Sequence, residues 1–221
     1  METPTDPTAL SHRIEEGLAR IAGVMRAESW NRAKRLGLTA TQLSILELLG
    51  DRPGGLGVKH IAANLGVSQP TATDSIAALE RKGLLTKRGA GADRRALVVA
   101  IAPAGRKALA EATAPRGAVE QAVDSLPVGE QQDLLLALVQ IIRGLQQLDA
   151  IPIQRMCVTC RFFAPFAHAD AAEPHHCHFV DAAFGQSSLR IDCRDHESAD
   201  PADRAATWKA FEQGSAFPPG S

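Results

Sequence analysis

The feature that most constrains this chain is a pair of helix signals that meet at a glycine turn within residues 58–83. Apolar residues recur at helical spacing before the turn, at Val58, Ile61, Ala62 and Leu65. Gly66 supplies the end of that helix and the tight turn. Ser68 and Pro70 are a hydroxyl cap and a first-turn proline, with which helices commonly begin. The sequence therefore predicts a helix-turn-helix.

The second helix of this pair has one apolar stripe and one polar side. The stripe consists of Ala72, Ile76 and Leu79, and the helix is expected to run to Gly83. The outer side of its first half carries Ser68, Gln69, Thr71, Thr73, Asp74 and Ser75. A helix-turn-helix inserts this part of its second helix into the major groove of DNA. Gln and Thr side chains can reach base edges there, so we expect Ser68, Gln69, Thr71 and Thr73 to contact DNA.

A basic hairpin is expected directly after the helix pair. Residues 84–88 and residues 94–101 are rich in strand-forming side chains, and a Gly/Ala-rich turn separates them. The basic residues crowd near the expected tip, at Lys87, Arg88, Arg94 and Arg95. In that position they could contact phosphates or enter the minor groove.

Charge is concentrated in the same part of the chain. Residues 52–107 hold ten Lys or Arg against three Asp or Glu, a balance of +7, whereas the whole chain has a net charge of −1. Such a focus of positive charge is typical of a nucleic-acid-binding surface. A plainer interpretation is a solvated helical hairpin with a basic turn, but the coincidence of cap, turn, hairpin and charge favours a DNA-binding unit.

Residues 36–107 resemble the winged-helix domain of the MarR family of bacterial transcriptional regulators. The matching runs are LTATQLSIL (38–46), IAANLGVS (61–68), LERKGLL (79–85), DRR (93–95) and PAGR (103–106). This chain has Asp74 where the family often has a basic residue. The resemblance implies a DNA-binding regulator of the repressor kind that acts as a homodimer on a pseudo-palindromic operator and can respond to a small-molecule effector.

Long helices are expected on both sides of this domain. Residues 8–35 carry a narrow apolar stripe, Thr39 caps the next helix, and a further helix is expected from Pro103 to about Val123. The helix that begins at Pro127 is so apolar that it needs a partner, and its copy in a second subunit is the simplest one. The alternative is an intramolecular bundle around the winged helix. The fold class is therefore mainly α with a small β-wing and long dimerisation helices.

A second informative region begins near residue 151, where the composition changes. All four cysteines lie there, at Cys157, Cys160, Cys177 and Cys193. About 45 residues with few secondary-structure signals cannot bury enough core to fold unaided, so a metal would stabilise them. Zinc could accept four cysteine sulfurs, or three together with His176 or His178. An iron–sulfur cluster is the other candidate. The spacing from Cys157 to Cys193, with its phenylalanines, resembles the cluster-binding segment of high-potential iron–sulfur proteins.

The histidines and the C-terminal tail carry weaker signals. His175 and His176 stand in a polar Glu-Pro-His-His run and are expected to face solvent, as is His196. We expect three regions: residues 1–150 for DNA binding and dimerisation, residues 151–200 as a small irregular metal-binding module, and residues 201–221 as a partly disordered tail. Within that tail, Trp208 and Phe211 could dock one short helix, and residues 217–221, like residues 1–7, should be loose.

Other functions stay open at this point. The cysteines could be redox-active thiols or ordinary buried thiols, and the module could belong to a redox enzyme or recruit another protein as an adaptor. We expect no enzyme, since the sequence shows no nucleotide loop, no HExxH and no clear Ser/His/Asp order. A signal peptide and a membrane-length apolar run are also missing from the sequence, which favours the cytoplasm.

Overall fold

The computed structural model describes residues 9–90, 93–111 and 116–214, with the backbone alone at residues 90 and 93–96. The chain forms two compact units, Met1–Ser125 and Leu126–Ser221. The sequence placed the change of domain near residue 150. In the structure the long helix before that point belongs to the second unit, because its apolar side packs on the cysteine-containing module.

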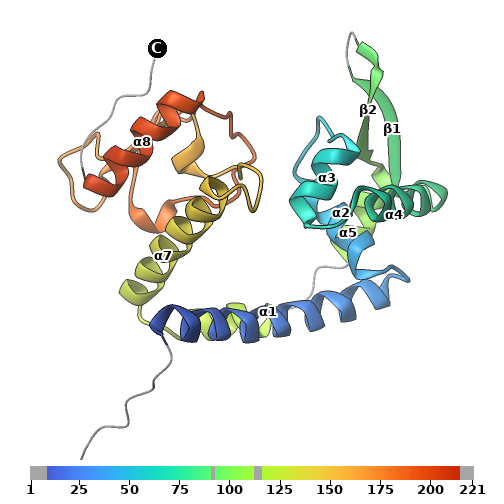
Figure 1. Cartoon of the computed structure of the whole chain (residues 1–221), viewed down its shortest axis with the longest axis horizontal. Coiled ribbons are helices and arrows are strands. Elements are labelled where there is room, and N and C mark those ends of the chain that lie inside the picture. Colours follow the sequence, from blue (N-terminus) through green and yellow to red (C-terminus); the bar gives the residue numbers. More distant parts are fainter. Residues whose placement is uncertain (1–8, 91–92, 112–115, 215–221) are drawn as a thin grey trace, which may run out of the picture. The chain divides into compact units, whose positions relative to one another are not determined.

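The first unit is a winged helix preceded by one long helix (Figure 1). Its elements are α1 (Leu10–Arg35), α2 (Ala40–Gly50), α3 (Val58–Leu65), α4 (Gln69–Arg81), β1 (Leu85–Ala90), β2 (Asp93–Ile101), α5 (Pro103–Glu111) and α6 (Ala118–Asp124). Strands β1 and β2 pair antiparallel, with Leu85 opposite Ile101 and Gly89 opposite Leu97. The core is a continuous cluster that includes Leu43, Ile45, Leu46, Leu49, Ile61, Ile76, Leu79 and Val99.

Local sequence signals set the helix boundaries in this unit, as predicted. The Thr39 hydroxyl accepts the backbone N–H of Gln42, and the Gln42 side chain accepts the backbone N–H of Thr39, each at 3.2 Å. Gly66 ends α3 with a left-handed φ of 62°. Ser68 caps α4 by accepting the Thr71 N–H. Gly105 of α5 has no room for a side chain, because a Cβ there would lie 2.3 Å from the Leu84 carbonyl oxygen.

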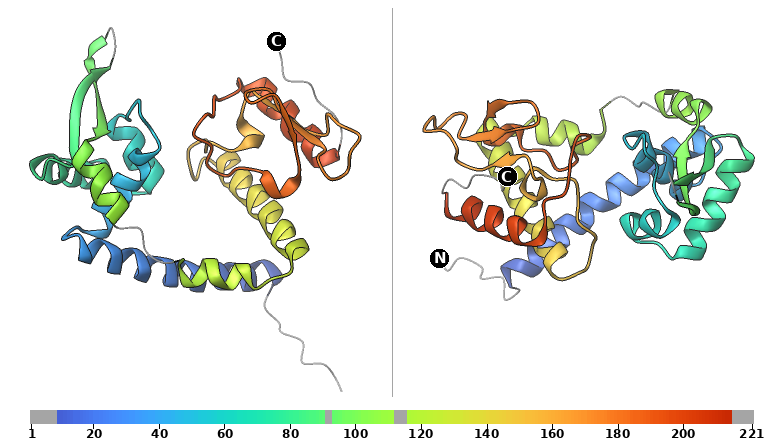
Figure 2. Two further views of the ribbon diagram at one scale, coloured as in Figure 1. Left: turned by 180° about the vertical axis from the view of Figure 1, so that it is seen from behind. Right: turned by 90° about the horizontal axis from the view of Figure 1, so that it is seen from above.

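The helix expected from Pro103 to about Val123 is two helices, α5 and α6, so that prediction was wrong. Gly117, the residue before α6, has an extended backbone and serves as its N-cap. The Glu28 carboxylate accepts the Ala118 N–H at 2.7 Å, which ties the start of α6 to α1. Helix α6 consequently runs beside α1 (Figure 2).

The second unit combines two helices with short strands and turns. Its elements are α7 (Val128–Gln147), the 3₁₀ turns η1 (Cys157–Thr159) and η2 (Gln186–Ser188), strands β3 (Phe163–Ala164), β4 (His175–Cys177) and β5 (Ala182–Phe184), and α8 (Pro201–Gln213). The strands form one antiparallel sheet in the order β3-β4-β5. The core combines Val139, Met156, Val158, Phe163, Leu189, Trp208 and Phe211.

Helix α7 has two apolar sides with different surroundings. Val139 is 1% exposed, and Leu135 and Ile142 also pack on the module core. Our expectation that a second subunit would be the partner of α7 was therefore incomplete, since the module already covers one side. A second set stays at least 38% exposed, namely Leu134, Ile141, Leu145 and Leu148.

The expected tail begins as an ordered helix. Asp200 caps α8 by accepting the N–H groups of Ala202 and Asp203, and Trp208 and Phe211 are buried. The loose ends expected at residues 1–7 and 217–221 lie outside the described residues. Among the residues that are described, no helix is both long and apolar enough to cross a membrane.

Candidate functional site

The first half of α4 presents its polar side chains to solvent. Ser68, Gln69, Thr71 and Thr73 are all exposed. The hydroxyls also serve the helix itself, because Ser68 and Thr71 hydrogen-bond each other at 2.7 Å and Thr73 donates to the Gln69 carbonyl at 2.8 Å. The Gln69 amide makes no hydrogen bond within the described part of the chain. Gln69 is therefore the predicted contact whose side chain is most available for a base edge.

Two of the predicted wing residues are held against the body of the domain. The Lys87 ammonium pairs with the Glu80 carboxylate at 2.7 Å. The Arg88 guanidinium donates to the Pro53 carbonyl at 2.6 Å. Arg94 and Arg95 lie on β2, and their side chains fall outside the described part of the structure. The structure thus places Lys87 and Arg88 at the base of the wing.

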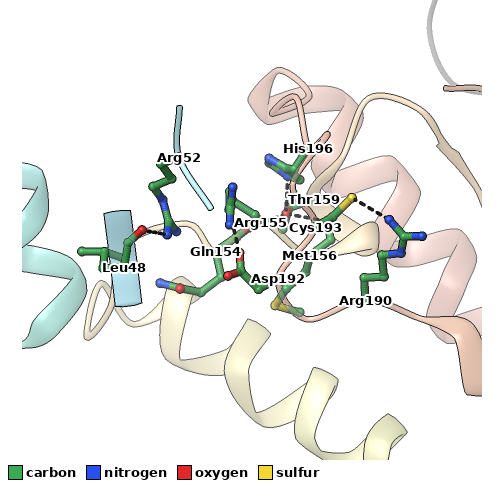
Figure 3. Close-up of polar contacts among 10 residues, drawn as sticks. All are labelled: Leu48, Arg52, Gln154, Arg155, Met156, Thr159, Arg190, Asp192, Cys193 and His196. Carbon is green, nitrogen blue, oxygen red and sulfur yellow. Dashed lines mark hydrogen bonds and ion pairs between the residues drawn. The ribbon is translucent and has the colours of Figure 1, made fainter. Parts of the chain in front are cut away.

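The base of the wing also contains two arginines that sequence reasoning did not single out. A cavity of about 250 Å³ lies between the loop after α2, the wing and the start of α5, and it is lined by Arg52, Arg88 and Arg106. Arg52 donates to the Leu48 carbonyl (Figure 3). Both arginines were included in the charge count over residues 52–107. Three arginines that line one hollow bring positive charge together at the base of the wing.

All four cysteines line one cavity in the second unit. Its volume is about 260 Å³. Cys157 and Cys160 lie in and just after η1, Cys177 lies on β4, and Cys193 follows η2. The pairing of Phe163 with Cys177 brings β4 beside the strand that follows the first two cysteines. The apolar part of the lining consists of Phe162, Phe163, Phe179, Val180, Ala182 and Phe184.

The four cysteines line this space without forming a compact set of ligands for a single ion. None of the four cysteines forms a disulfide. Among the described residues, no three Cys, His, Asp or Glu side chains lie close enough together to hold one metal ion. A structural zinc site requires four ligand atoms about 2.3 Å from one ion, which is a tighter arrangement than this cavity.

Hydrogen-bond donors point at the cysteine sulfurs. The Arg190 N–H donates to Cys157 Sγ at 3.2 Å. The Arg190 guanidinium donates to Cys193 Sγ at 3.6 Å (Figure 3). Burial raises the pKa of the Cys157 thiol to about 11, the Arg190 N–H opposes the rise, and the nearby Cys193, Cys160 and Cys177 add to it. Reactive cysteines have a lowered pKa, so the surroundings of Cys157 do not support a nucleophilic thiol at that position.

The histidines are placed differently from our expectation. His175 is 2% exposed and not solvent-facing as predicted; it packs among Phe163, Phe166 and Phe211, and burial lowers its pKa to about 4. The polar Glu-Pro-His-His run gave no sign of this burial. His176, the alternative zinc ligand, contacts His168 at 3.1 Å and Asp181 at 3.2 Å.

Two further histidines complete the comparison with the predicted ligands. His178 is exposed, and neither it nor His176 lines the cysteine cavity. His196 was expected at the surface, but it is half-buried and hydrogen-bonds Thr159 at 3.0 Å (Figure 3). The structure thus brings the four predicted cysteine ligands together and leaves the alternative histidine ligands elsewhere.

Comparison with known proteins identifies the winged helix. Residues 36–96 match the model of the MarR family. The chain is similar to the transcriptional regulator BldR from Sulfolobus solfataricus at 27% identity, over 63% of this chain and 99% of BldR, with a TM-score of 0.53. These matches support a winged helix of the MarR regulator type.

Two structures of the regulator CouR also match. CouR from Rhodococcus jostii RHA1 bound to p-coumaroyl-CoA is 23% identical over 66% of this chain and 97% of CouR, with a TM-score of 0.49. The repressor CouR bound to a 23-mer DNA duplex is 27% identical over 64% of this chain and 99% of that chain, with a TM-score of 0.48.

Proposed function

We propose that this protein is a DNA-binding transcriptional repressor that binds a pseudo-palindromic operator as a homodimer. A metal site formed by Cys157, Cys160, Cys177 and Cys193 modulates its affinity for DNA. The observation that carries the proposal is the exposed polar half of α4, which stands beside a basic wing on a MarR-type winged helix. A small-molecule effector is a further expected partner.

Charge and side-chain chemistry support DNA as the partner. Gln69 offers an exposed amide for base edges, while Arg52, Arg88 and Arg106 collect positive charge at the base of the wing. Base contacts give sequence preference and phosphate contacts give affinity, so the two groups have separate roles. The wing-tip residues Arg94 and Arg95 are proposed to add phosphate or minor-groove contacts.

The exposed apolar residues of α1 support dimerisation. Residues on this helix at least 38% exposed include Leu10, Ile14, Leu18, Ile21, Val24 and Met25. A stripe of this length is unusual on the surface of a monomer and is typical of an interaction site. A second copy would cover it and would present two α4 helices to two half-sites of a palindrome.

Selection of bound duplexes from a random DNA pool, followed by titration over a range of salt concentrations, tests DNA recognition. Arg95→Ala should weaken binding to all sequences and reduce the salt dependence by about one released ion, because one phosphate or groove contact is lost. Gln69→Ala should change the selected sequence more than the affinity. Arg116→Ala is the matched control, since it removes the same charge from an exposed site before α6.

Sequence-specific binding, the role of the wing and the effect of the metal site each have a separate outcome in these experiments. Absence of any selected sequence would contradict sequence-specific DNA binding. An unchanged affinity and salt slope for Arg95→Ala would contradict its role in the wing. For the metal site, the titration is repeated with metal-loaded and metal-free protein, because a regulator must bind DNA differently in its two states. Equal affinities would make the module purely structural.

A further inference from the structure

We infer that the cavity formed by Cys157, Cys160, Cys177 and Cys193 holds a four-iron iron–sulfur cluster, with each cysteine sulfur bound to one iron. This inference rests on the metal site of the proposed function and specifies its occupant. It does not depend on DNA binding. Three observations carry it: the size of the cavity, the apolar lining and the hydrogen bonds to the sulfurs.

The size of the cavity matches a cluster better than a single ion. Four sulfurs around one zinc ion lie about 3.8 Å from one another by tetrahedral geometry, which leaves space for the ion alone. Here the four cysteines line a cavity of about 260 Å³ together with nine other residues, and no three potential ligands among the described residues form a group that could hold one metal ion. A four-iron cluster places a block of iron and sulfide between its ligands, so its cysteines stand apart around a hollow.

The lining gives the cavity the surroundings that clusters require. Phe162, Phe163 and Phe184 line the same cavity as the four cysteines. Rings in this position keep water from the cluster and set its reduction potential. A zinc site has no comparable need for apolar side chains inside the ring of ligands, because the ion occupies all of that space.

Hydrogen bonds to the ligand sulfurs complete the site. Arg190 contributes two of them, from its N–H to Cys157 and from its guanidinium to Cys193. Backbone groups of Phe162 and Glu197 also hydrogen-bond Cys160. Donors to sulfur stabilise thiolates and are among the features by which proteins tune iron–sulfur clusters. Arg190 is therefore a positioning residue that also brings a positive charge beside Cys193.

The test is purification of the full chain without oxygen, followed by iron, sulfide and zinc analysis and by visible and electron paramagnetic resonance spectra. We expect about four irons and about four sulfides per chain, a brown colour and a signal that changes when dithionite donates one electron. Two irons per chain, or one zinc in a colourless protein, would overturn the inference. Zinc would still leave the proposed metal site in place, whereas no bound metal would contradict both.

Variants identify the ligands. Cys177→Ser should lose most of the iron and the visible absorption, whereas His178→Gln should keep both, because His178 is exposed and does not line the cavity. Retention of iron by Cys177→Ser together with loss in His178→Gln would overturn the ligand assignment. Trp208 lies in the core of the same unit, so its fluorescence in a Trp30→Phe background shows whether each variant is folded.

Arg190 provides a test that does not require loss of the cluster. Its positive charge beside Cys193 should make addition of an electron easier. Arg190→Gln should therefore lower the reduction potential, and Arg190→Lys should restore part of the shift. A potential that is identical in all three proteins would overturn the role assigned to Arg190. Iron content reports on the cluster itself in the same samples.

Discussion

The two units of the molecule reach stability by different means. In the first unit, Leu43, Ile45, Leu46 and Leu49 of α2 are fully buried, and side chains from every surrounding element pack against them. In the second unit, a smaller aromatic core lies beside a hollow lined by four cysteines. Apolar burial stabilises the winged helix, whereas under the proposed function a bound metal would stabilise the cysteine module.

The largest expected effect comes from removing the proposed metal. Chelation should unfold the second unit and leave the first unit folded, because a structural metal contributes its binding free energy to folding. Thermal unfolding followed by Trp208 fluorescence, in the Trp30→Phe background, should lose its transition. Circular dichroism should retain the helices of the winged helix.

The control is to chelate the metal and to follow the unfolding of the first unit instead of the second. Trp30 is 55% exposed on α1 and belongs to the other unit, so a Trp208→Phe variant reports on that unit alone. Its transition should not move. If chelation left the Trp208 transition unchanged, the contrast between the two units would be wrong.

A substitution in the core of the winged helix should destabilise the first unit and leave the second unit unchanged. Leu46→Ala should destabilise the winged helix by about 2–5 kcal/mol, because it removes a fully buried side chain and leaves a cavity. Iron content and visible absorption should not change. Leu97→Ala is the matched control, since Leu97 is 57% exposed and its loss should change the free energy of unfolding by less than about 0.5 kcal/mol. Equal effects of the two changes in chemical denaturation would contradict the core assignment.

The smallest expected effect concerns a helix cap. Thr39→Ala removes the hydroxyl that accepts the Gln42 N–H at the start of α2, leaves the backbone N–H of residue 39 in place, and should cost about 1 kcal/mol of unfolding free energy. Thr39→Ser keeps the hydroxyl and should retain most of the stability. Denaturant titration of the three proteins measures the difference, and a Thr39→Ser protein as unstable as Thr39→Ala would show that the hydroxyl is not responsible.

Local chemistry explains why the winged helix was predictable. Thr39, Gly66 and Ser68 each fix a helix boundary through a hydrogen bond or a backbone angle that involves near neighbours. The break between α5 and α6 was missed because the alanine-rich sequence before it favours helix. The contacts of Arg88 with Pro53, 35 residues away, depend on the tertiary fold and give no local signal.

The cysteine module was only partly predictable. Spacing identified Cys157, Cys160, Cys177 and Cys193 as a set, but their arrangement around a cavity depends on three short strands without a clear periodic pattern. The burial of His175 was missed because the residues before it are polar. Its position follows from strand pairing with Phe184 and from rings contributed by distant parts of the unit.

The two apolar sides of α7 have a consequence for the evolution of this chain. One side is fixed by the module core around Val139, and under the proposed dimer the other side, with Leu134 and Ile141, is fixed by the partner. Neutral substitutions can then accumulate only at exposed polar positions such as Asp133 and Gln140. Among related chains that carry the module, the sequence of α7 should therefore diverge more slowly than that of α1. In a chain that has lost the four cysteines, substitutions in α7 should appear first on the side of Val139.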